Sequence, residues 1–327
     1  MTSDRANTLR RFLRNPAMLV GLVVLLTLTL ASLVSLPWTL NAPPGAADPR
    51  YNQTDLDAFL LPPTWAMGGA HDDAAARYDA LGGEPFFVMG TDNLGRDLFV
   101  RCLAGGGVSI GIGLAAALIA VVIGTLYGAI AALAGGRVDG VMMRIVDILY
   151  GLPYVLLVVL LAVAGDAMLE KIEMSAGQRQ FFEVVVLLIA IGGVSWLTMA
   201  RVIRGQVLSL KAQPFMEAAR ATAIPVRTQF LRHLLPNLLA PIIVYATLTV
   251  PQAILQESFL SFLGIGVQPP LPSWGNLAAD GLSELNPVRV RWWLIVFPCC
   301  LLALTLLALN FVGEGLRDAF DPKRSAT

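Results

Sequence analysis

Six apolar stretches, each long enough to cross a lipid bilayer, constrain this chain of 327 residues more than any other feature. A helix needs about twenty consecutive apolar residues to cross the hydrocarbon of a membrane. Apolar residues make up 56% of the chain and charged residues 14%, whereas about a quarter of a soluble domain is charged. We therefore predict an all-α integral membrane protein with six transmembrane helices. The six stretches are 17–40, 108–133, 141–164, 181–203, 238–260 and 292–312.

The second and third stretches are separated only by the short glycine-rich segment 134–140. Glycines at such spacing are typical of a tight turn. We therefore predict that these two stretches form an antiparallel helical hairpin. The second stretch is also rich in Gly and Ala, as tightly packed membrane helices often are.

The charges of the connecting segments alternate and predict an orientation. Basic residues dominate before the first stretch and after the fourth, whereas acidic residues dominate after the first and third. Because cytoplasmic loops carry an excess of Lys and Arg, we expect both termini in the cytoplasm. The basic residues are Arg5, Arg10, Arg11, Arg14, and then Arg204, Lys211, Arg220, Arg227 and Arg232.

The first stretch is predicted to be an uncleaved anchor rather than a signal peptide. Its apolar core is longer than a usual signal-peptide core. No clear small-x-small cleavage site follows before Pro37.

The sequence contains no nucleotide-binding or catalytic motif. A Walker A motif needs Lys after Gly, and none of the three lysines, Lys171, Lys211 and Lys323, follows a glycine. The two histidines, His71 and His233, are isolated, and the three cysteines show no metal-ligand spacing. A net charge of zero gives no indication of a nucleic-acid partner. We expect a non-catalytic chain without metal or cofactor of its own.

The segment between the fourth and fifth stretches is polar and rich in helix formers. Pro214 suits the first turn of a helix, and the residues after it favour helix until Pro225 interrupts. A second short helix is expected over 226–235, which Pro236 ends or bends as the fifth span begins. The first helix exposes one acid, Glu217, among alanines. It is interpreted as a docking surface for another protein, or alternatively as an amphipathic helix on lipid headgroups.

Two segments on the opposite side of the membrane have turn-like sequences. Segment 89–97 combines Gly with Asn and Asp, which indicates a structural turn before the second span or, alternatively, a substrate contact. Segment 264–276 is dense in Pro and Gly. For Trp274, and for Trp292 and Trp293 before the sixth span, we favour anchoring at the membrane interface over ligand stacking.

Several motifs resemble one protein family. Glu217-Ala218-Ala219, Ala223, His233 and Leu235-Pro236 resemble the cytoplasmic loop of permease subunits of binding-protein-dependent ABC importers. Further segments, 90–97, 137–147, 261–276 and 313–322, are similar to the C-type subunit of dipeptide, oligopeptide and nickel importers. The match covers nearly the whole chain in order, except for 41–85.

Two positions depart from the family pattern. Ala223 stands where Gly is usual, and His233 stands where an aliphatic residue is usual. A left-handed Ala costs about 1 kcal/mol, so Ile224-Pro225 is expected to end the helix by another route.

The resemblance implies a type I ABC importer permease fold in a bacterial inner membrane. It implies a heterodimer with a second permease subunit, two ATPase subunits that bind ATP and Mg, and a periplasmic or lipid-anchored binding protein. The residues it assigns to ATPase docking are Phe215, Glu217, Ala218, Ala219, Arg220, Ala223, Leu235 and Pro236. Those in the outer loops, facing the partner permease or the binding protein, are Asp92, Arg96, Asp97, Gln268, Trp274 and Asn276.

The expected division of the chain follows from the spans and the resemblance. It comprises a cytoplasmic N-terminus 1–16, a first transmembrane helix 17–40, a periplasmic segment 41–104, a five-helix permease core 105–312 with coupling loop 204–236 and outer loop 263–291, and a cytoplasmic tail 313–327.

An ion-coupled secondary transporter or channel subunit is the main alternative function. Such proteins place ionisable residues within the membrane, and Arg144, Asp147 and Glu257 lie near the ends of predicted spans. A membrane-embedded enzyme would need a catalytic cluster within the spans, and the sequence has none. For substrate, di- or oligopeptides are the expectation, with nickel chelates and other small solutes left open.

Overall fold

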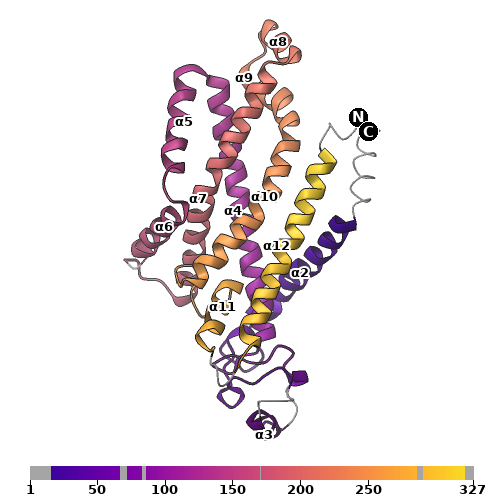
Figure 1. Cartoon of the computed structure of the whole chain (residues 1–327). Helices are drawn as coiled ribbons and strands as arrows, with labels where there is room; N and C mark the ends of the chain where they lie inside the picture. Colours follow the sequence, from indigo (N-terminus) through magenta and orange to yellow (C-terminus); the bar gives the residue numbers. More distant parts are fainter. Residues whose placement is uncertain (1–15, 67–71, 83–85, 170, 286–289, 321–327) are drawn as a thin grey trace.

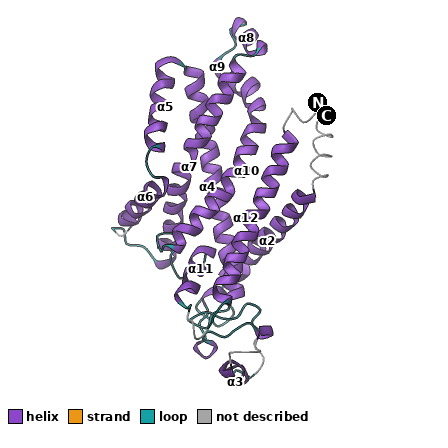
Figure 2. Ribbon diagram, in the orientation of Figure 1, coloured by secondary structure: helices purple, strands orange, loops and turns teal. Residues whose placement is uncertain are grey.

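A computed structural model describes residues 16–66, 72–82, 86–169, 171–285 and 290–320. Within these ranges the chain is helical, with only an isolated bridge between Thr91 and Asp97 in extended pairing. Figure 2 shows this all-helical architecture, which confirms the predicted fold class at that level. The remainder of the predicted terminal segments, 1–15 and 321–327, lies outside the described residues.

Five long helices run side by side through the molecule (Figure 1). Each is long and apolar enough to cross a membrane and contains, to within one residue, one of the predicted stretches. They are α2 (Pro16–Leu40), α4 (Leu98–Ala134), α7 (Ala176–Lys211), α10 (Leu235–Phe262) and α12 (Trp293–Phe320).

The predicted third span, 141–164, is not one continuous helix. The chain instead forms α5 (Gly136–Tyr150) and α6 (Tyr154–Leu169), which meet at 90°. Pro153 explains the break, because it donates no backbone hydrogen bond and disfavours helical backbone in the residue before it. The N–H of Gly151 closes α5 on the carbonyl of Asp147 at 3.0 Å. The third predicted span is therefore a bent pair of helices, and the number of candidate spans is five, or six if this pair counts as one.

The predicted glycine turn does join α4 to α5. Gly135 and Gly136 adopt φ angles of 64° and 53°, a region in which residues with a Cβ are strained. The hydroxyl of Tyr127 on α4 then donates to the carbonyl of Met142 on α5 at 2.9 Å. This bond holds α5 against the helix that precedes it.

The short elements gather at the two ends of the bundle (Figure 1). We call one end the α8 end, after α8 (Pro214–Ala221), and the other the α11 end, after α11 (Trp274–Ser283). The first turn of α2 and the last turn of α12 lie at the ends of these helices that point toward the α8 end (Figure 1). The elements of the segment before α4, at the α11 end, are η1 (Arg50–Asn52), η2 (Leu56–Ala58), η3 (Thr64–Ala66) and α3 (Asp72–Ala80).

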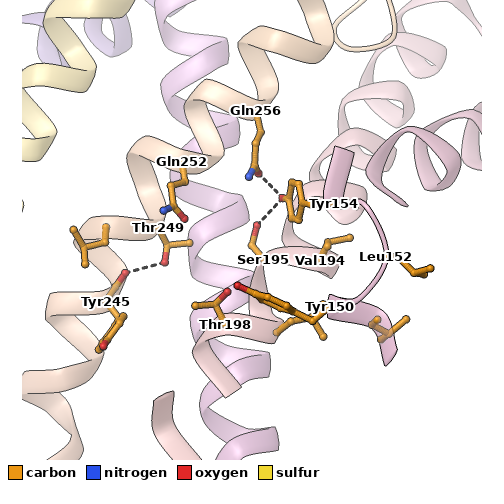
Figure 3. A pocket seen from close by; sticks show the side chains of 13 residues that line it. Tyr150, Leu152, Tyr154, Val194, Ser195, Thr198, Tyr245, Thr249, Gln252 and Gln256 are labelled. Carbon is orange, nitrogen blue, oxygen red and sulfur yellow. Dashed lines mark hydrogen bonds between the residues drawn. The ribbon is translucent and has the colours of Figure 1, made fainter. Parts of the chain in front are cut away.

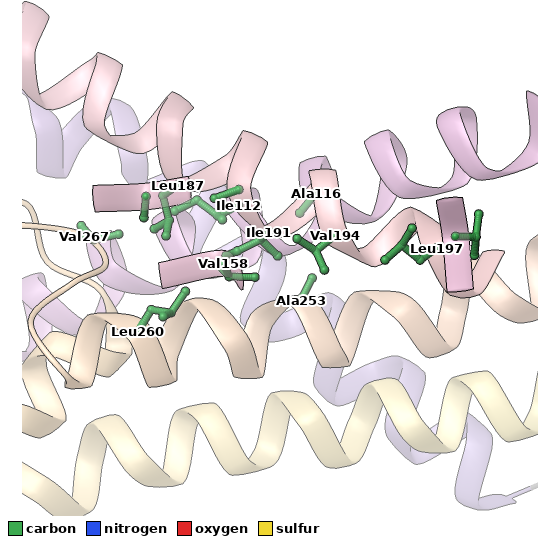
Figure 4. Packing of buried hydrophobic residues seen from close by; sticks show 13 residues of the cluster. Ile112, Ala116, Val158, Leu187, Ile191, Val194, Leu197, Ala253, Leu260 and Val267 are labelled. Atoms are coloured by element: carbon green, nitrogen blue, oxygen red, sulfur yellow. The ribbon is translucent and has the colours of Figure 1, made fainter. Parts of the chain in front are cut away.

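The largest hydrophobic core joins α4, α6, α7 and α10 (Figure 4). Ile112 and Ala116 of α4 contribute to it together with Val158 of α6, Ile191 of α7 and Ala253 of α10. Because α6 takes part, the broken third span packs against the bundle rather than away from it.

Glycines bring α4 into backbone contact with α7. A β-carbon at Gly124 would lie 2.5 Å from the Cβ of Met199, and one at Gly128 would lie 2.3 Å from the carbonyl oxygen of Ala200. Real Cβ contacts are never that short, so each position requires glycine at this helix separation. Gly111, on the same helix, has open space where its Cβ would be.

Substitution of these glycines tests the close contact. Gly128→Ala should destabilise the protein by about 1–3 kcal/mol, because its methyl group would push against the backbone of α7. Gly111→Ala should be neutral or slightly stabilising, because Ala is the better helix former. The melting temperature of the purified protein in detergent measures both effects, and equal values for the two variants would contradict the packing described.

Candidate functional site

Helix α8 presents one face outward and seats the other. Met216 is fully buried and Ala219 is 4% exposed, whereas Phe215, Glu217 and Arg220 are exposed. Met216 packs in a cluster with Ile203 and Val207 of α7, with Leu238 of α10, and with Leu234 directly before α10. Four of the five predicted docking residues on this helix are therefore exposed, and one, Ala219, is buried. The exposed residues are Phe215, Glu217, Ala218 and Arg220.

The turn after α8 keeps left-handed geometry although it lacks glycine. Ala223 has a φ of 55°. Its N–H donates to the carbonyl of Arg220 at 3.0 Å, and the N–H of Ile224 donates to Ala219 at 3.1 Å. These two bonds form a Schellman motif. The expectation that Ile224-Pro225 would replace this turn by another route was wrong, because the surrounding hydrogen bonds impose the strained conformation.

The second predicted helix of the loop runs directly into α10. It begins as α9 (Val226–Thr228), continues through a π-helical turn (Gln229–Leu234) and forms one 37-residue helix with α10. Pro236 does not end this helix, so of the two expected effects, an end or a bend, the first is wrong. The N–H of Leu235 donates within the π turn to the carbonyl of Phe230. Pro236, which has no N–H to donate, follows in the first turn of α10.

Charged side chains fasten the α8 end to the bundle. The guanidinium of Arg220 donates to the carbonyl of Lys211, and the ammonium of Lys211 donates to the carbonyl of Ala132 at 2.6 Å. Arg204 of α7 holds Asp139 of α5 through two bonds of 2.5 and 2.6 Å. Bidentate pairs of this kind are geometrically specific. Helix α8 is thus connected through α7 to α4 and α5.

At the α11 end, the predicted turn 89–97 is held by its own side chains. Asp92 accepts the N–H of Leu94 at 2.9 Å, and both the N–H and the Nε of Arg96 at 3.0 and 2.7 Å. Asp97 caps α4 by accepting the N–H of Phe99 at 2.8 Å. Arg101 of α4 lies 3.0 Å from Asp92. Since Asp92 and Arg96 are buried, their assignment to an outward face is corrected.

The loop before α11 is fixed in the same way. Trp274 is 1% exposed and its indole N–H donates to the carbonyl of Cys102 at 3.0 Å. Asn276 is also buried and completes a capping box with Ser273. Gln268 is half-buried and donates to the carbonyl of Gly264 at 2.9 Å.

Two expectations for these loops are therefore corrected. Trp274 packs within the chain instead of anchoring it at a membrane interface, and Trp293 likewise is 1% exposed, with its indole N–H donating to Thr91. Asn276 faces the loop instead of a partner.

Asp280 connects the two outer segments. It lies 3.7 Å from the guanidinium of Arg101. Burial raises the pKa of the Asp280 carboxyl, and the neighbouring Arg101 charge acts in the opposite direction. A carboxylate in this position joins α11 to the start of α4.

A cavity of about 430 Å³, lined by both polar and apolar side chains, lies between the α5–α6 break, α7 and α10 (Figure 3). Hydroxyl and amide side chains face one another across it, with five leucine and valine side chains between them. None of the described residues that line it is a carboxylate, a Lys, an Arg or a His. Its polar residues are Tyr150, Tyr154, Ser195, Thr198, Tyr245, Thr249, Gln252 and Gln256.

Four of these residues form a stripe along α10. Tyr245, Thr249, Gln252 and Gln256 follow one another at intervals of four, three and four residues, which places them on one helix face. None of these residues was among the expected site residues, although the spacing of polar side chains within an apolar span indicates a polar helix face. Ser195 and Thr198, at a spacing of three, form the facing wall on α7.

Tyr154 closes the cavity at the start of α6. Its hydroxyl donates to the side-chain carbonyl of Gln256 and lies 3.1 Å from the Ser195 hydroxyl (Figure 3). Three helices are thereby joined at one atom. By contrast, the Gln252 amide has no hydrogen-bond partner among the described residues.

Two of the three ionisable residues considered for ion coupling have other contacts, and the third is exposed. Asp147 pairs with Arg201 at 2.8 Å, and Arg201 also lies over the Tyr150 ring at 4.2 Å. Glu257 is fully buried and accepts the Ser261 hydroxyl at 2.8 Å. Arg144 is exposed. Among the described residues no group of three His, Cys, Asp or Glu side chains could hold a metal ion.

Two family models match the sequence. The model of the binding-protein-dependent transport system inner membrane component matches residues 120–326. The model of the N-terminal TM domain of oligopeptide transport permease C matches residues 5–63. Together they cover most of the chain, including the broken third span and the whole of the loop that carries α8.

Curated relatives match over much of their length. The oligopeptide transport system permease proteins OppC of Haemophilus influenzae and Escherichia coli are each 42% identical over 314 residues, or 96% of this chain. The match covers 87% and 89% of those proteins. The dipeptide transport system permease protein DppC of Bacillus subtilis is 44% identical over 235 residues, 72% of this chain and 68% of that protein.

The strained turn after α8 predicts that glycine substitutions at two alanines change local stability in opposite directions. Ala223→Gly should stabilise the turn by up to about 1 kcal/mol, because glycine adopts positive φ without strain. Ala218→Gly, within α8, should destabilise the helix by up to about 1 kcal/mol. Amide hydrogen exchange of residues 216–224 measures both, and faster exchange in Ala223→Gly would contradict the turn geometry.

Proposed function

Because the chain belongs to the family of binding-protein-dependent transport system inner membrane components, we propose that it is the permease subunit of an ATP-driven importer of oligopeptides or dipeptides. The relatives named as oligopeptide and dipeptide permeases support this substrate class. The family is one of multi-pass inner-membrane proteins, and the five long apolar helices agree with that location. The family component is a membrane permease, so the hydrolysis of ATP falls to partner subunits.

The observation that carries the proposal is the two-faced α8. Its outward face offers Phe215, Glu217 and Arg220, while Met216 anchors the helix in the bundle. The small side chain of Ala218 between them allows a partner's backbone to approach closely. We assign this face to an ATPase subunit. Ala223, Leu235 and Pro236 shape the loop behind it and need not touch the partner.

A partner that binds α8 would act on α7, α4 and α5 through hydrogen bonds. Arg220 is bonded to the end of α7, Lys211 connects α7 to α4, and Arg204 connects α7 to α5. A displacement of α8 therefore acts on α4 and also on α5 and α7, which line the cavity. Such a connection is what alternating access needs, since the two ends of a path must open in turn.

The orientation follows from the same loop. We place the α8 end in the cytoplasm, where an ATPase can reach it, and the α11 end on the periplasmic side. The bent pair α5–α6 then counts as the third of six spans. The proposed division of the chain is otherwise as expected from the sequence, with the coupling loop at 204–236 and the outer loop at 263–291.

The proposed assembly contains a second permease subunit, two ATPase subunits that bind ATP and Mg, and a substrate-binding protein on the periplasmic side. Membership of a binding-protein-dependent family supports the presence of such partners. Two of the outer-loop residues expected to face the partner permease or the binding protein remain candidates for such a contact. They are the half-buried residues Asp97 and Gln268.

An ion-coupled mechanism is not favoured. The relatives are permeases of binding-protein-dependent systems. The ionisable side chains near the spans have structural contacts, as in the pair of Asp147 with Arg201 and the serine contacts of Glu257.

The energy source is testable with the complete transporter in proteoliposomes. Uptake of a radiolabelled tripeptide, delivered by the binding protein, should require ATP and stop with vanadate. It should persist when a protonophore and a sodium ionophore collapse the ion gradients. Uptake that ignores vanadate but stops with the ionophores would contradict the proposal.

The docking surface is testable by charge reversal. Glu217→Lys should remove the ATPase subunits from the purified complex and reduce peptide uptake at least tenfold, because a basic side chain of the partner that pairs with Glu217 would then face a like charge, which costs several kcal/mol. Glu173→Lys is the matched control, since Glu173 is exposed in the loop between α6 and α7, away from α8. Normal assembly and normal uptake with Glu217→Lys would contradict the assignment of the α8 face to an ATPase subunit.

A further inference from the structure

We propose that the cavity at the α5–α6 break binds the main-chain amides of the transported peptide, and that it does so without selecting for the charge of the side chains. The inference rests on the proposed function, because it takes the peptide to pass this face of the chain. It adds a binding site on this subunit and the residues that form it, with Gln252 and Gln256 as the central contacts.

The location of the polar groups indicates that this face meets water or a ligand rather than lipid. The stripe from Tyr245 to Gln256 occupies one face of a helix that is otherwise apolar enough to span the membrane. Gln252 and Thr198 are exposed in this chain. Amide and hydroxyl groups left in hydrocarbon without partners cost several kcal/mol each, so a lipid-facing position is unfavourable.

The chemistry of the lining fits a neutral amide. A glutamine side chain both donates and accepts hydrogen bonds, as a peptide unit does. In Gln256 the carbonyl oxygen accepts the bond from Tyr154, which turns the amide so that its NH₂ group has no partner among the described residues. Gln252, one turn away, has both its donor and its acceptor without a described partner. The two amides together can bind one N–H and one C=O.

The lack of charge in the lining sets the selectivity. None of the described lining residues carries a carboxylate, ammonium, guanidinium or imidazole group. A charged side chain placed there would lose water without gaining an opposite charge, whichever sign it had. Arg201 is in contact with the lining, because its guanidinium lies over the ring of Tyr150, and it pairs with Asp147 at 2.8 Å. The cavity therefore treats acidic and basic peptides alike.

The cavity is also of suitable size and position. Its volume of about 430 Å³ lies within the usual range for small-molecule sites, about 300–1,000 Å³, and accommodates part of a short peptide. It lies beside the break between α5 and α6, and the Tyr154 hydroxyl joins α6 to α7 and α10 there. Movement of α6 would break this junction and change the width of the site.

A charge placed at Gln252 tests the proposal. The complete transporter is reconstituted in proteoliposomes with wild-type chain, Gln252→Glu or Gln252→Lys. Uptake of Ala-Lys-Ala and of Ala-Glu-Ala is measured, with Ala-Ala-Ala as the neutral reference. The binding protein is the same throughout, so its own preference cancels when each ratio is divided by that of the wild type.

We expect the two variants to shift selectivity in opposite directions. Gln252→Glu should raise the ratio of Ala-Lys-Ala to Ala-Glu-Ala uptake about tenfold, and Gln252→Lys should lower it by a similar factor, through the charge interaction in the cavity. Gln178→Glu is the matched control. It makes the same Gln-to-Glu change about 25 Å along α7 from Ser195. A Glu at position 178 retains the capping box with Ser175. The uptake ratio of this variant should equal that of the wild type.

Other outcomes overturn the proposal. Unchanged ratios in both variants, with uptake retained, would show that peptides do not touch this cavity. If both variants lose all uptake, a labelling experiment tests the proposal instead. Thr249→Cys is introduced into a chain in which the exposed Cys299 and Cys300 are replaced by Ser. The rate at which a neutral maleimide labels the new cysteine is then measured. Peptide-loaded binding protein with ATP should slow labelling at Thr249→Cys and leave Thr247→Cys, outside the lining, unaffected; no slowing overturns the inference. Failure of the wild type to import any tripeptide would instead count against the proposed function.

Discussion

The backbone contact between α4 and α7 is the interaction on which the rest of the structure depends. It is possible only because Gly124 and Gly128 leave room for the atoms of Met199 and Ala200. With α7 held this close, Arg204 reaches Asp139 on α5, and Lys211 reaches the carbonyl of Ala132 at the end of α4. These charged contacts then fix the surface on which α8 is seated. A small change in helix separation would thus alter polar contacts well beyond the glycines.

The same helices carry both the docking surface and the cavity. Helix α7 extends without interruption from the cavity wall at Ser195 to Lys211, next to α8. Helix α10 carries the polar stripe and continues through the π turn into the loop behind α8. The cavity and the docking surface therefore share two continuous elements. This is a physical connection through packed helices rather than a correlation between distant residues.

The long apolar spans were predictable because their length and composition leave few other folds for them, and five of the six formed as expected. The third span is bent by 90°, because its apolar sequence continues across Pro153 whereas a regular helical backbone does not. Burial was harder to predict. Trp274 has the composition of an interface anchor, but its neighbours place its indole N–H against Cys102. Ala223 shows that hydrogen bonds from Ile224 can impose a turn that the local sequence disfavours. The stripe on α10 was readable from spacing, but its facing wall depends on tertiary packing.

The unbroken helix from Val226 to Phe262 has a mechanical consequence. Its 37 residues make a rod of about 55 Å. If such a rod tilts by about 5° around its midpoint, each end moves by about 2.4 Å, in opposite directions. A modest push beside α8 is thereby converted into an opposite movement of similar size at the α11 end. One side of the bundle can narrow while the other widens, although no residue in the rod changes its conformation.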